Sequence, residues 1–124
     1  MAKKKILIVD DEPNLLMILS TRLKYVGFEV ETADNGEIAI EKAKKYIPHL
    51  ILLDIMMPGM DGFSVLSRLK EEKKTRSVII VMLTSKGDLP SIERALALGA
   101  VDYVVKPFSP VTIIEKIKKI LRVK

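Results

Sequence analysis

The chain has 124 residues, of which 48% are hydrophobic and 30% are charged, so we expect a single compact domain over residues 1–124. It has no cysteine, which excludes disulfide bonds and thiolate metal sites, and its net charge of +5 comes from lysines scattered among glutamates. The apolar stretch Ile6 to Val9 is shorter than the about 7–15 residues of a signal peptide or the about 20 of a membrane helix. We therefore expect a cytoplasmic protein that binds neither membranes nor nucleic acids directly.

Five short apolar segments alternate along the chain with segments that have the period of helices. The apolar segments are Lys5–Val9, Phe28–Thr32, Leu50–Leu53, Val78–Leu83 and Val101–Val105. The first, third and fourth are almost continuously apolar, which is typical of strands that are buried on both faces of a parallel sheet. These segments predict five strands.

Five helices are expected between and after these strands. The first opens with Pro13 and closes at Gly27, and the second runs from about Gly36 to Tyr46. The third begins near Phe63, the fourth spans 89–99, and Ser109 is the expected N-cap of the fifth. The stripe expected to face the core is Leu15, Leu19, Leu23 and Val26 in the first helix. In the fifth helix it is Val111, Ile114, Ile117 and Leu121, with Ile113 and Ile120 on its flank.

This alternation predicts the α/β class, with a doubly wound five-stranded parallel sheet of flavodoxin-like (βα)5 type and strand order 2-1-3-4-5. In such sheets, ligands bind beyond the carboxyl ends of the strands, near the point where the strand order reverses. The residues at those ends are therefore the candidates for a functional site.

Polar residues follow four of the expected strands. Asp10 and Asp11 follow the first, Asp54 follows the third, Thr84 and Ser85 follow the fourth, and Lys106 with Pro107 follows the fifth. Three clustered carboxylates repel one another unless cations neutralise them. Lys106 supplies one positive charge, and a hard divalent ion such as Mg²⁺ suits a set of carboxylates without histidine or cysteine.

Each of these residues also has a purely structural interpretation. Asp11 is suited to cap the first helix, Asp54 to end a strand, and Thr84 or Ser85 to form a turn. Lys106 is long enough to extend from a strand end to solvent. Their joint placement at one edge of the sheet is what favours a functional site over chance.

The stretches ILIVDDEP, LILLDIMMPGMDGF, VIIVMLTS and GAVDYVVKPFSP resemble the receiver domains of bacterial response regulators, and the resemblance covers the whole chain. It implies that Asp54 is phosphorylated and that Asp10, Asp11, Asp54 and the main-chain carbonyl of Met56 hold Mg²⁺, for which Mn²⁺ can substitute. It further implies that Thr84 and Tyr103 are switch residues, that Lys106 contacts the phosphoryl group and that the Lys106–Pro107 bond is cis. Ser85 is a polar departure from the pattern, and Met56 and Lys86 occupy variable positions.

The same resemblance implies a signalling switch with intrinsic autophosphorylation and autodephosphorylation rather than an enzyme in the classified sense. Its phosphodonor would be a sensor histidine kinase, a phosphotransfer protein or a small molecule. The face made by the fourth helix, the fifth strand and the fifth helix would then control a partner, an output domain or a second copy of the chain. Leu96, Leu98, Ile113 and Ile120 are expected on this face.

Three other classes of protein share part of this pattern. Haloacid dehalogenase-type phosphatases have a second aspartate two residues after the nucleophile, where this chain has Met56. A flavodoxin-like FMN carrier needs a phosphate-binding loop after the first strand, where Asp10, Asp11 and Glu12 would repel a phosphate. A receiver-like binding module that is never phosphorylated is the third, and the intact set of acidic, hydroxyl and lysine residues argues against it.

Overall fold

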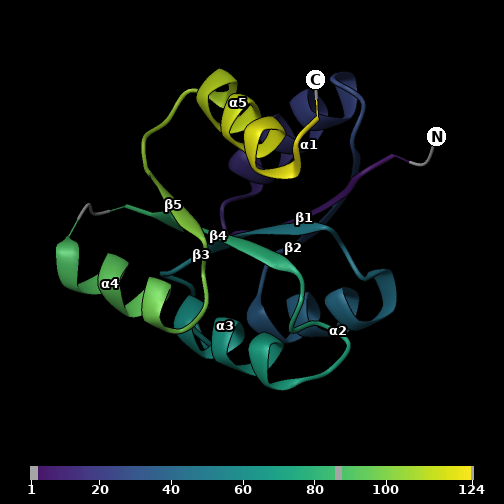
Figure 1. The fold of residues 1–124 in the computed structure, drawn as a ribbon. Coiled ribbons are helices and arrows are strands. Elements are labelled where there is room, and N and C mark those ends of the chain that lie inside the picture. Colours follow the sequence, from purple (N-terminus) through teal and green to yellow (C-terminus); the bar gives the residue numbers. More distant parts are fainter. Residues whose placement is uncertain (1–2, 86–87, 124) are drawn as a thin grey trace.

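The computed structural model describes residues 3–85 and 88–123, and in that part of the chain five parallel strands alternate with five helices (Figure 1). The strands are β1 (Lys5–Val9), β2 (Glu29–Ala33), β3 (Leu50–Asp54), β4 (Ile79–Thr84) and β5 (Asp102–Val105). The helices are α1 (Pro13–Tyr25), α2 (Gly36–Tyr46), α3 (Gly62–Glu71), α4 (Leu89–Ala97) and α5 (Pro110–Leu121). Lys86 lies outside the described residues.

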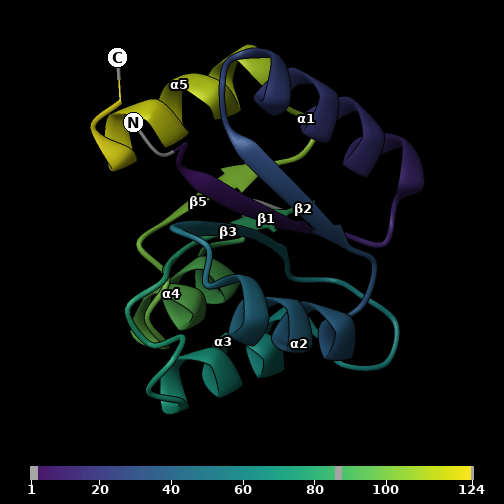
Figure 2. The same cartoon turned by 90° about the vertical axis from the view of Figure 1, so that its right-hand side faces the viewer.

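The sheet has the order β2-β1-β3-β4-β5, which confirms the predicted topology. Helices α1 and α5 cover one face, and α2, α3 and α4 cover the other, as both views of the ribbon show (Figures 1 and 2). Alternate side chains of each strand point to opposite faces, so the core has two halves. Leu7, Ile51 and Ile80 belong to the half under α2–α4, and Ile8 and Leu52 belong to the half under α1 and α5.

The central strands are buried over nearly their whole length, as their continuously apolar sequences predicted. β1 pairs with β3 so that Val9 lies opposite Leu53, and β3 pairs with β4 so that Asp54 lies opposite Leu83. Because all strands run in the same direction, the residues that follow them meet at one edge of the sheet.

Side-chain caps fix where four of the helices start. Asn35, Asp61, Asp88 and Ser109 each accept a hydrogen bond from a backbone N–H in the first turn of α2, α3, α4 and α5. Helix α1 is different, because its N-cap is Glu12, which makes no side-chain cap, and Pro13 begins the helix. The structural interpretation of Asp11 as a cap is therefore wrong.

The core-facing stripe of α5 was predicted correctly at Ile114, Ile117 and Leu121 but wrongly at Val111. Val111 is 50% exposed, whereas Ile113, which was expected on the flank, is fully buried with Ile114 and Ile117. Val111 lies in the first turn, and the buried stripe starts only where the helix passes over the sheet. Val26 was also wrongly placed in the stripe of α1, because it follows the last helical residue and is 37% exposed.

None of the described helices is both long enough and apolar enough to cross a membrane.

Candidate functional site

The carboxyl ends of β1 and β3 bring three acidic side chains together. Asp10 follows β1 directly and Asp54 is the last residue of β3, and these strands are neighbours in the sheet. One carboxylate oxygen from each of Asp10, Asp11 and Asp54 lies within 4.8 Å of the other two. The sequence had predicted this cluster from the topology alone.

Backbone N–H groups hold the two buried carboxylates in place. Asp10 is fully buried, its Oδ1 accepts a hydrogen bond from the N–H of Glu12 at 3.0 Å, and its own N–H donates to the Ala33 carbonyl at 3.1 Å. Asp54 is 3% exposed, and its Oδ1 accepts from the N–H of Met56 at 3.3 Å. Asp11, in contrast, is exposed. The cluster thus has two fixed carboxylates and a third that faces solvent.

The start of α3 packs directly against the backbone of Asp54. The N–H of Gly62 donates to the Ile55 carbonyl at 2.9 Å, and a Cβ at position 62 would collide with the carbonyl oxygen of Asp54. Asp61 caps this helix through the N–H of Ser64. Glycine at position 62 is therefore what allows the helix to approach the end of β3 so closely.

Lys106 brings a positive charge to the acidic cluster from the other side. Its backbone N–H donates to the Thr84 carbonyl at 2.7 Å, and this hydrogen bond fixes the backbone of Lys106 just beyond the end of β5. Its Nζ lies 2.7 Å from Asp10 Oδ2, 3.0 Å from Glu12 Oε1 and 3.6 Å from Asp54 Oδ2. The Lys106–Pro107 bond is cis, as expected from the resemblance.

The acidic surroundings change the protonation of both Asp54 and Lys106. Burial raises the pKa of Asp54 from 3.8 to about 6, the charge of Asp10 adds to this rise, and Lys106 opposes it. Burial on its own would lower the pKa of Lys106, but its contacts with Asp10 and Glu12 outweigh burial and raise that pKa. Lys106 is therefore a cation at neutral pH, whereas ionisation of Asp54 lowers the stability of the folded state.

The donor set fits a hard divalent cation. All three acidic side chains offer oxygen, which Mg²⁺ and Mn²⁺ accept. Asp10 Oδ2 is buried and lies 2.7 Å from Lys106 Nζ in an ion pair, but it has no further hydrogen-bond partner among the described residues. A buried carboxylate oxygen of this kind, in a residue of the acidic cluster, is a candidate ligand atom for a metal ion.

Thr84 and Tyr103 lie on the neighbouring strands. Thr84 is the last residue of β4 and follows Leu83, which pairs with Asp54. Its exposed fraction is 3%. Tyr103 is half-buried on the edge strand β5, where it packs against the core half under α2–α4. A hollow of about 350 Å³ between Met56, Thr84 and Ser85 opens the site to solvent on this side.

Glu12 and Gly62 belong to the site but were not identified from the sequence. Glu12 Oε1 accepts a hydrogen bond from Lys106 Nζ, and the only signal for this role in the sequence was that Glu12 extends the acidic run Asp10-Asp11. Gly62 acts by lacking a side chain, and a glycine after Asp61 also has an ordinary explanation as part of a turn. Neither role follows from residue type and spacing alone.

A doubly wound parallel sheet with an acidic triad, a hydroxyl and a lysine at its carboxyl edge defines a receiver-type phosphorelay module. Residues 6–118 match the family model described as the response regulator receiver domain, and the chain belongs to that family.

Two full-length regulators and one solved structure illustrate the similarity. The chain is 47% identical to "Probable transcriptional regulator ycf27" of Pyropia yezoensis over 97% of its length, and 42% identical to the Bacillus subtilis alkaline phosphatase synthesis transcriptional regulatory protein PhoP over 96%. It covers 48% and 49% of these relatives, so it spans about half of their length. The structure of the Vibrio cholerae chemotaxis protein CheY4 superimposes with a TM-score of 0.91 and 33% identity, covering 95% of this chain and 98% of that one.

Proposed function

We propose that the chain is a phosphoacceptor switch in which the Asp54 carboxylate takes a phosphoryl group from a histidine kinase, a phosphotransfer protein or a small phosphodonor. The observation that carries this proposal is the position of Asp54, which is fixed at the end of a buried strand with Lys106 Nζ 3.6 Å from its Oδ2. In this role residues 1–124 act as one receiver unit, and the protein is a signalling switch rather than a classical enzyme.

In the proposed reaction, a carboxylate oxygen of Asp54 attacks phosphorus in line, and the leaving group departs from the opposite side. The developing charge on the phosphoryl oxygens is stabilised by the Lys106 ammonium, which is already held at the site by Asp10 and Glu12. Hydrolysis of the acyl phosphate by water returns the free carboxylate. Hydrolysis releases inorganic phosphate, and Asp54 is the residue that forms the covalent bond in this cycle.

Asp10, Asp11, Asp54 and the main-chain carbonyl of Met56 would hold Mg²⁺ or Mn²⁺. When bound, such an ion supplies positive charge that neutralises the carboxylates and the phosphoryl oxygens. Asp10 Oδ2, which has no further hydrogen-bond partner besides its ion pair with Lys106 in the part of the chain that the structure describes, is the strongest support for this ligand set.

Thr84 is the proposed sensor of the phosphoryl group. Its hydroxyl can donate a hydrogen bond to a phosphoryl oxygen on Asp54, and this contact would favour one of two positions of Thr84. Tyr103 lies on the next strand, opposite Met82, and would change its burial as Thr84 moves. Through these residues the face formed by α4, β5 and α5 would control a partner, an output domain or a second copy.

Labelling by acetyl phosphate tests the assignment of Asp54. After incubation with acetyl phosphate and Mg²⁺, intact mass spectrometry should show one added phosphoryl group on the wild-type chain. Asp54→Asn should show none, because an amide is not a competent nucleophile. The matched control Asp34→Asn changes an exposed aspartate and should be labelled normally. Undiminished labelling of Asp54→Asn would refute the assignment.

Removal of one carboxylate tests the metal site. Asp11→Ala should weaken Mg²⁺ binding about tenfold or more, because one of three acidic ligands is lost while the buried pair stays in place. The rise in melting temperature with Mg²⁺ concentration measures this affinity, and Asp34→Ala, outside the acidic cluster, is the control. Equal affinities for the wild type and Asp11→Ala would contradict the ligand set.

A further inference from the structure

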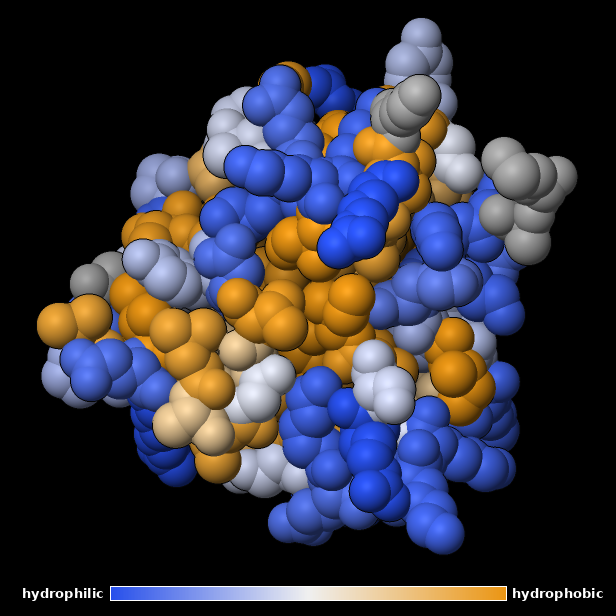
Figure 3. Space-filling model, viewed as in Figure 1, coloured by the Kyte–Doolittle hydropathy of each residue, from blue (hydrophilic) through white to orange (hydrophobic). Residues whose placement is uncertain are grey.

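A groove of about 450 Å³ lies at the end of the sheet opposite Asp54. It is bounded by the start of β4, the residues between α2 and β3, and the C-terminal end of α5. Its lining residues are Lys4, Ile47, Pro48, His49, Lys74, Ser77, Val78, Ile79, Ile120, Leu121 and Arg122. Figure 3 shows a hydrophobic area on this side of the molecule, below α5, bordered by hydrophilic residues.

The floor of the groove is apolar and only partly covered. Ile79, Ile120 and Leu121 are half-buried, with one side packed on the core under α1 and α5. Ile47, in the wall of the groove, is 42% exposed. Burial of these side chains by a ligand would remove apolar surface from water, which favours binding.

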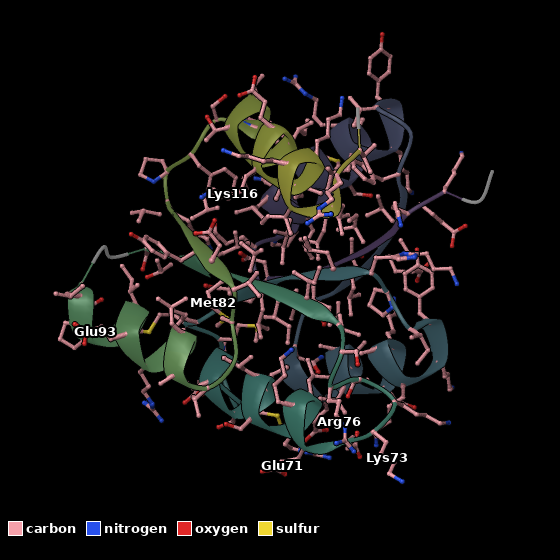
Figure 4. All side chains as sticks on the ribbon, viewed as in Figure 1. Glu71, Lys73, Arg76, Met82, Glu93 and Lys116 are labelled. Atoms are coloured by element: carbon pink, nitrogen blue, oxygen red, sulfur yellow. The ribbon has the colours of Figure 1, made fainter. Side chains whose placement is uncertain are left out.

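The rim of the groove carries charge of one sign. Lys4, Lys74 and Arg122 line it, and none of the described residues that line it is acidic. Lys73 and Arg76 come from the same α3–β4 segment as Lys74, and Figure 4 shows them at the lower right of the molecule, on the surface near this segment. An anionic ligand is therefore favoured over a cationic one.

Hydrogen bonds hold the walls of the groove in place. The N–H of His49 donates to the Lys5 carbonyl at 2.9 Å, and the His49 carbonyl accepts from the N–H of Ile79 at 3.2 Å, so His49 joins β1 to β4. On the other side, Lys70 Nζ donates to the Arg76 and Val78 carbonyls at 3.0 and 2.8 Å. A groove with fixed walls loses little conformational entropy when a ligand binds.

Ile47 is held in an unfavourable backbone conformation. It is the C-cap that follows α2, and its φ of 47° lies in the left-handed region, where a β-branched side chain is rare and glycine or asparagine is preferred. An exposed isoleucine at such a position lowers the stability of the fold, and strain of this kind tends to occur at functional surfaces.

We propose that this groove binds a short segment of a partner protein in which acidic side chains lie beside apolar ones. The apolar residues would cover Ile79, Ile120 and Leu121, and the acidic residues would pair with Lys4, Lys74 and Arg122. A nucleic acid would use the basic rim but leave the apolar floor uncovered, and a lipid surface is too flat to enter a groove. Because the site lies at the far end of the sheet, its binding does not depend on Asp54.

Fluorescence anisotropy with a labelled peptide of about 14 residues, made of glutamate and leucine with the leucines on one helical face, tests the proposal. The peptide should bind the intact chain, and a permuted peptide of the same composition should bind less tightly. Lys74→Glu/Arg122→Glu should lower the affinity about tenfold, since two attractive charges become repulsive. The control Lys24→Glu/Lys45→Glu changes the net charge equally but alters exposed residues outside the groove.

Ile47→Asn provides a second variant, which should fold at least as stably as the wild type. Asparagine tolerates the left-handed conformation, so this variant should unfold at a higher urea concentration than the wild type and yet bind the peptide more weakly. An equal loss of peptide binding in both charge-reversed variants would refute the groove as the binding site. So would unchanged affinity in Ile47→Asn, or preferential binding of a labelled DNA duplex or of anionic lipid vesicles at this groove.

Discussion

Burial raises the pKa of the Asp54 carboxyl group, and this shift links the chemistry of Asp54 to the stability of the fold. Its pKa is raised from 3.8 to about 6 by burial and by the charge of Asp10. The folded state therefore holds this proton more tightly than the unfolded state does. The resulting stabilisation is fully present below pH 3.8 and is lost as the pH rises through about 6.

Because the charged form of Asp54 destabilises the fold, we predict that Asp54→Asn stabilises the metal-free protein at neutral pH. Two pKa units correspond to about 3 kcal/mol, so urea unfolding at pH 7.5 in a chelator should show a gain of about 2–3 kcal/mol. The gain should shrink below pH 4, where Asp54 is protonated in both states. Asp34→Asn, at an exposed position, should give no comparable gain at either pH. A lower stability of Asp54→Asn at pH 7.5 would contradict the raised pKa.

Lys106 shows what residue types alone cannot predict. Its place beside the acidic cluster followed from the strand order, but its pairing with Glu12 did not, because a hydrogen bond across 94 residues depends on the loop after β5. The buried pair of Asp10 and Asp54 was likewise predictable, whereas the exposure of Asp11 was not. Strand patterns determine which edge a residue reaches, and loop geometry determines which atoms it contacts.

Among the secondary structure elements, α3 is the one whose placement the site depends on most directly. Gly62→Ala would place a Cβ against the Asp54 carbonyl oxygen and the Cα of Ile55, so the first turn of α3 must shift. We predict a loss of about 2 kcal/mol or more in the free energy of unfolding, together with weaker Mg²⁺ binding.

Gly59→Ala is the matched control for this substitution. Gly59 has a φ of 80°, but a Cβ at this position would meet no atom of the described residues within 4 Å. Alanine there should therefore cost only about 1 kcal/mol, through backbone conformation alone. Its effect on Mg²⁺ affinity should be smaller than that of Gly62→Ala. Equal effects of the two variants on Mg²⁺ binding would show that the close approach of α3 is not important for the site.

The strands were easier to predict than the helix faces. Continuously apolar segments indicated the bounds of β1, β3 and β4 to within one residue. Both faces of these strands are buried, so their side chains are apolar whichever face they point to. Helix α5 offered several stripes, since half of its residues are isoleucine, valine or leucine, and their spacing alone does not determine the rotation of the helix about its axis. The packing of Ile113 against the sheet settled that rotation.

At the scale of the whole molecule, apolar residues reach the surface on the α4–β5–α5 face, at one edge of the sheet. Leu96 on α4 and Val105 on β5 are 43% and 38% exposed, and Lys116 of α5 pairs with Asp102 of β5 at 2.9 Å. Figure 4 shows Lys116 on α5 near β5 and Glu93 on α4, so the face also carries charges of both signs. Ile113, once expected here, is in the core.

We predict that this face associates with a second copy when Asp54 carries a phosphoryl group or its mimic. Sedimentation velocity with beryllofluoride and Mg²⁺ should show a dimer, and Leu96→Ser should reduce it because an exposed apolar contact is lost. Asp54→Asn should stay monomeric under the same conditions. A wild-type chain that stays monomeric at high concentration would refute self-association and leave docking of another partner as the role of the face.

The order of the strands divides the site between the two halves of the chain. Asp10 and Asp11 follow β1 and Asp54 ends β3, all within the first 54 residues. Thr84 ends β4, and Lys106 follows β5. The seam between β3 and β4, where Asp54 lies opposite Leu83, is thus also the boundary between the proposed phosphoacceptor Asp54 and the proposed sensor Thr84. A small slide along this seam would change the distance from Asp54 to Lys106 while leaving the spacing of Asp10 and Asp54 intact. In the proposed switch, such a slide would transmit a displacement while the carboxylates proposed to hold a metal ion keep their spacing.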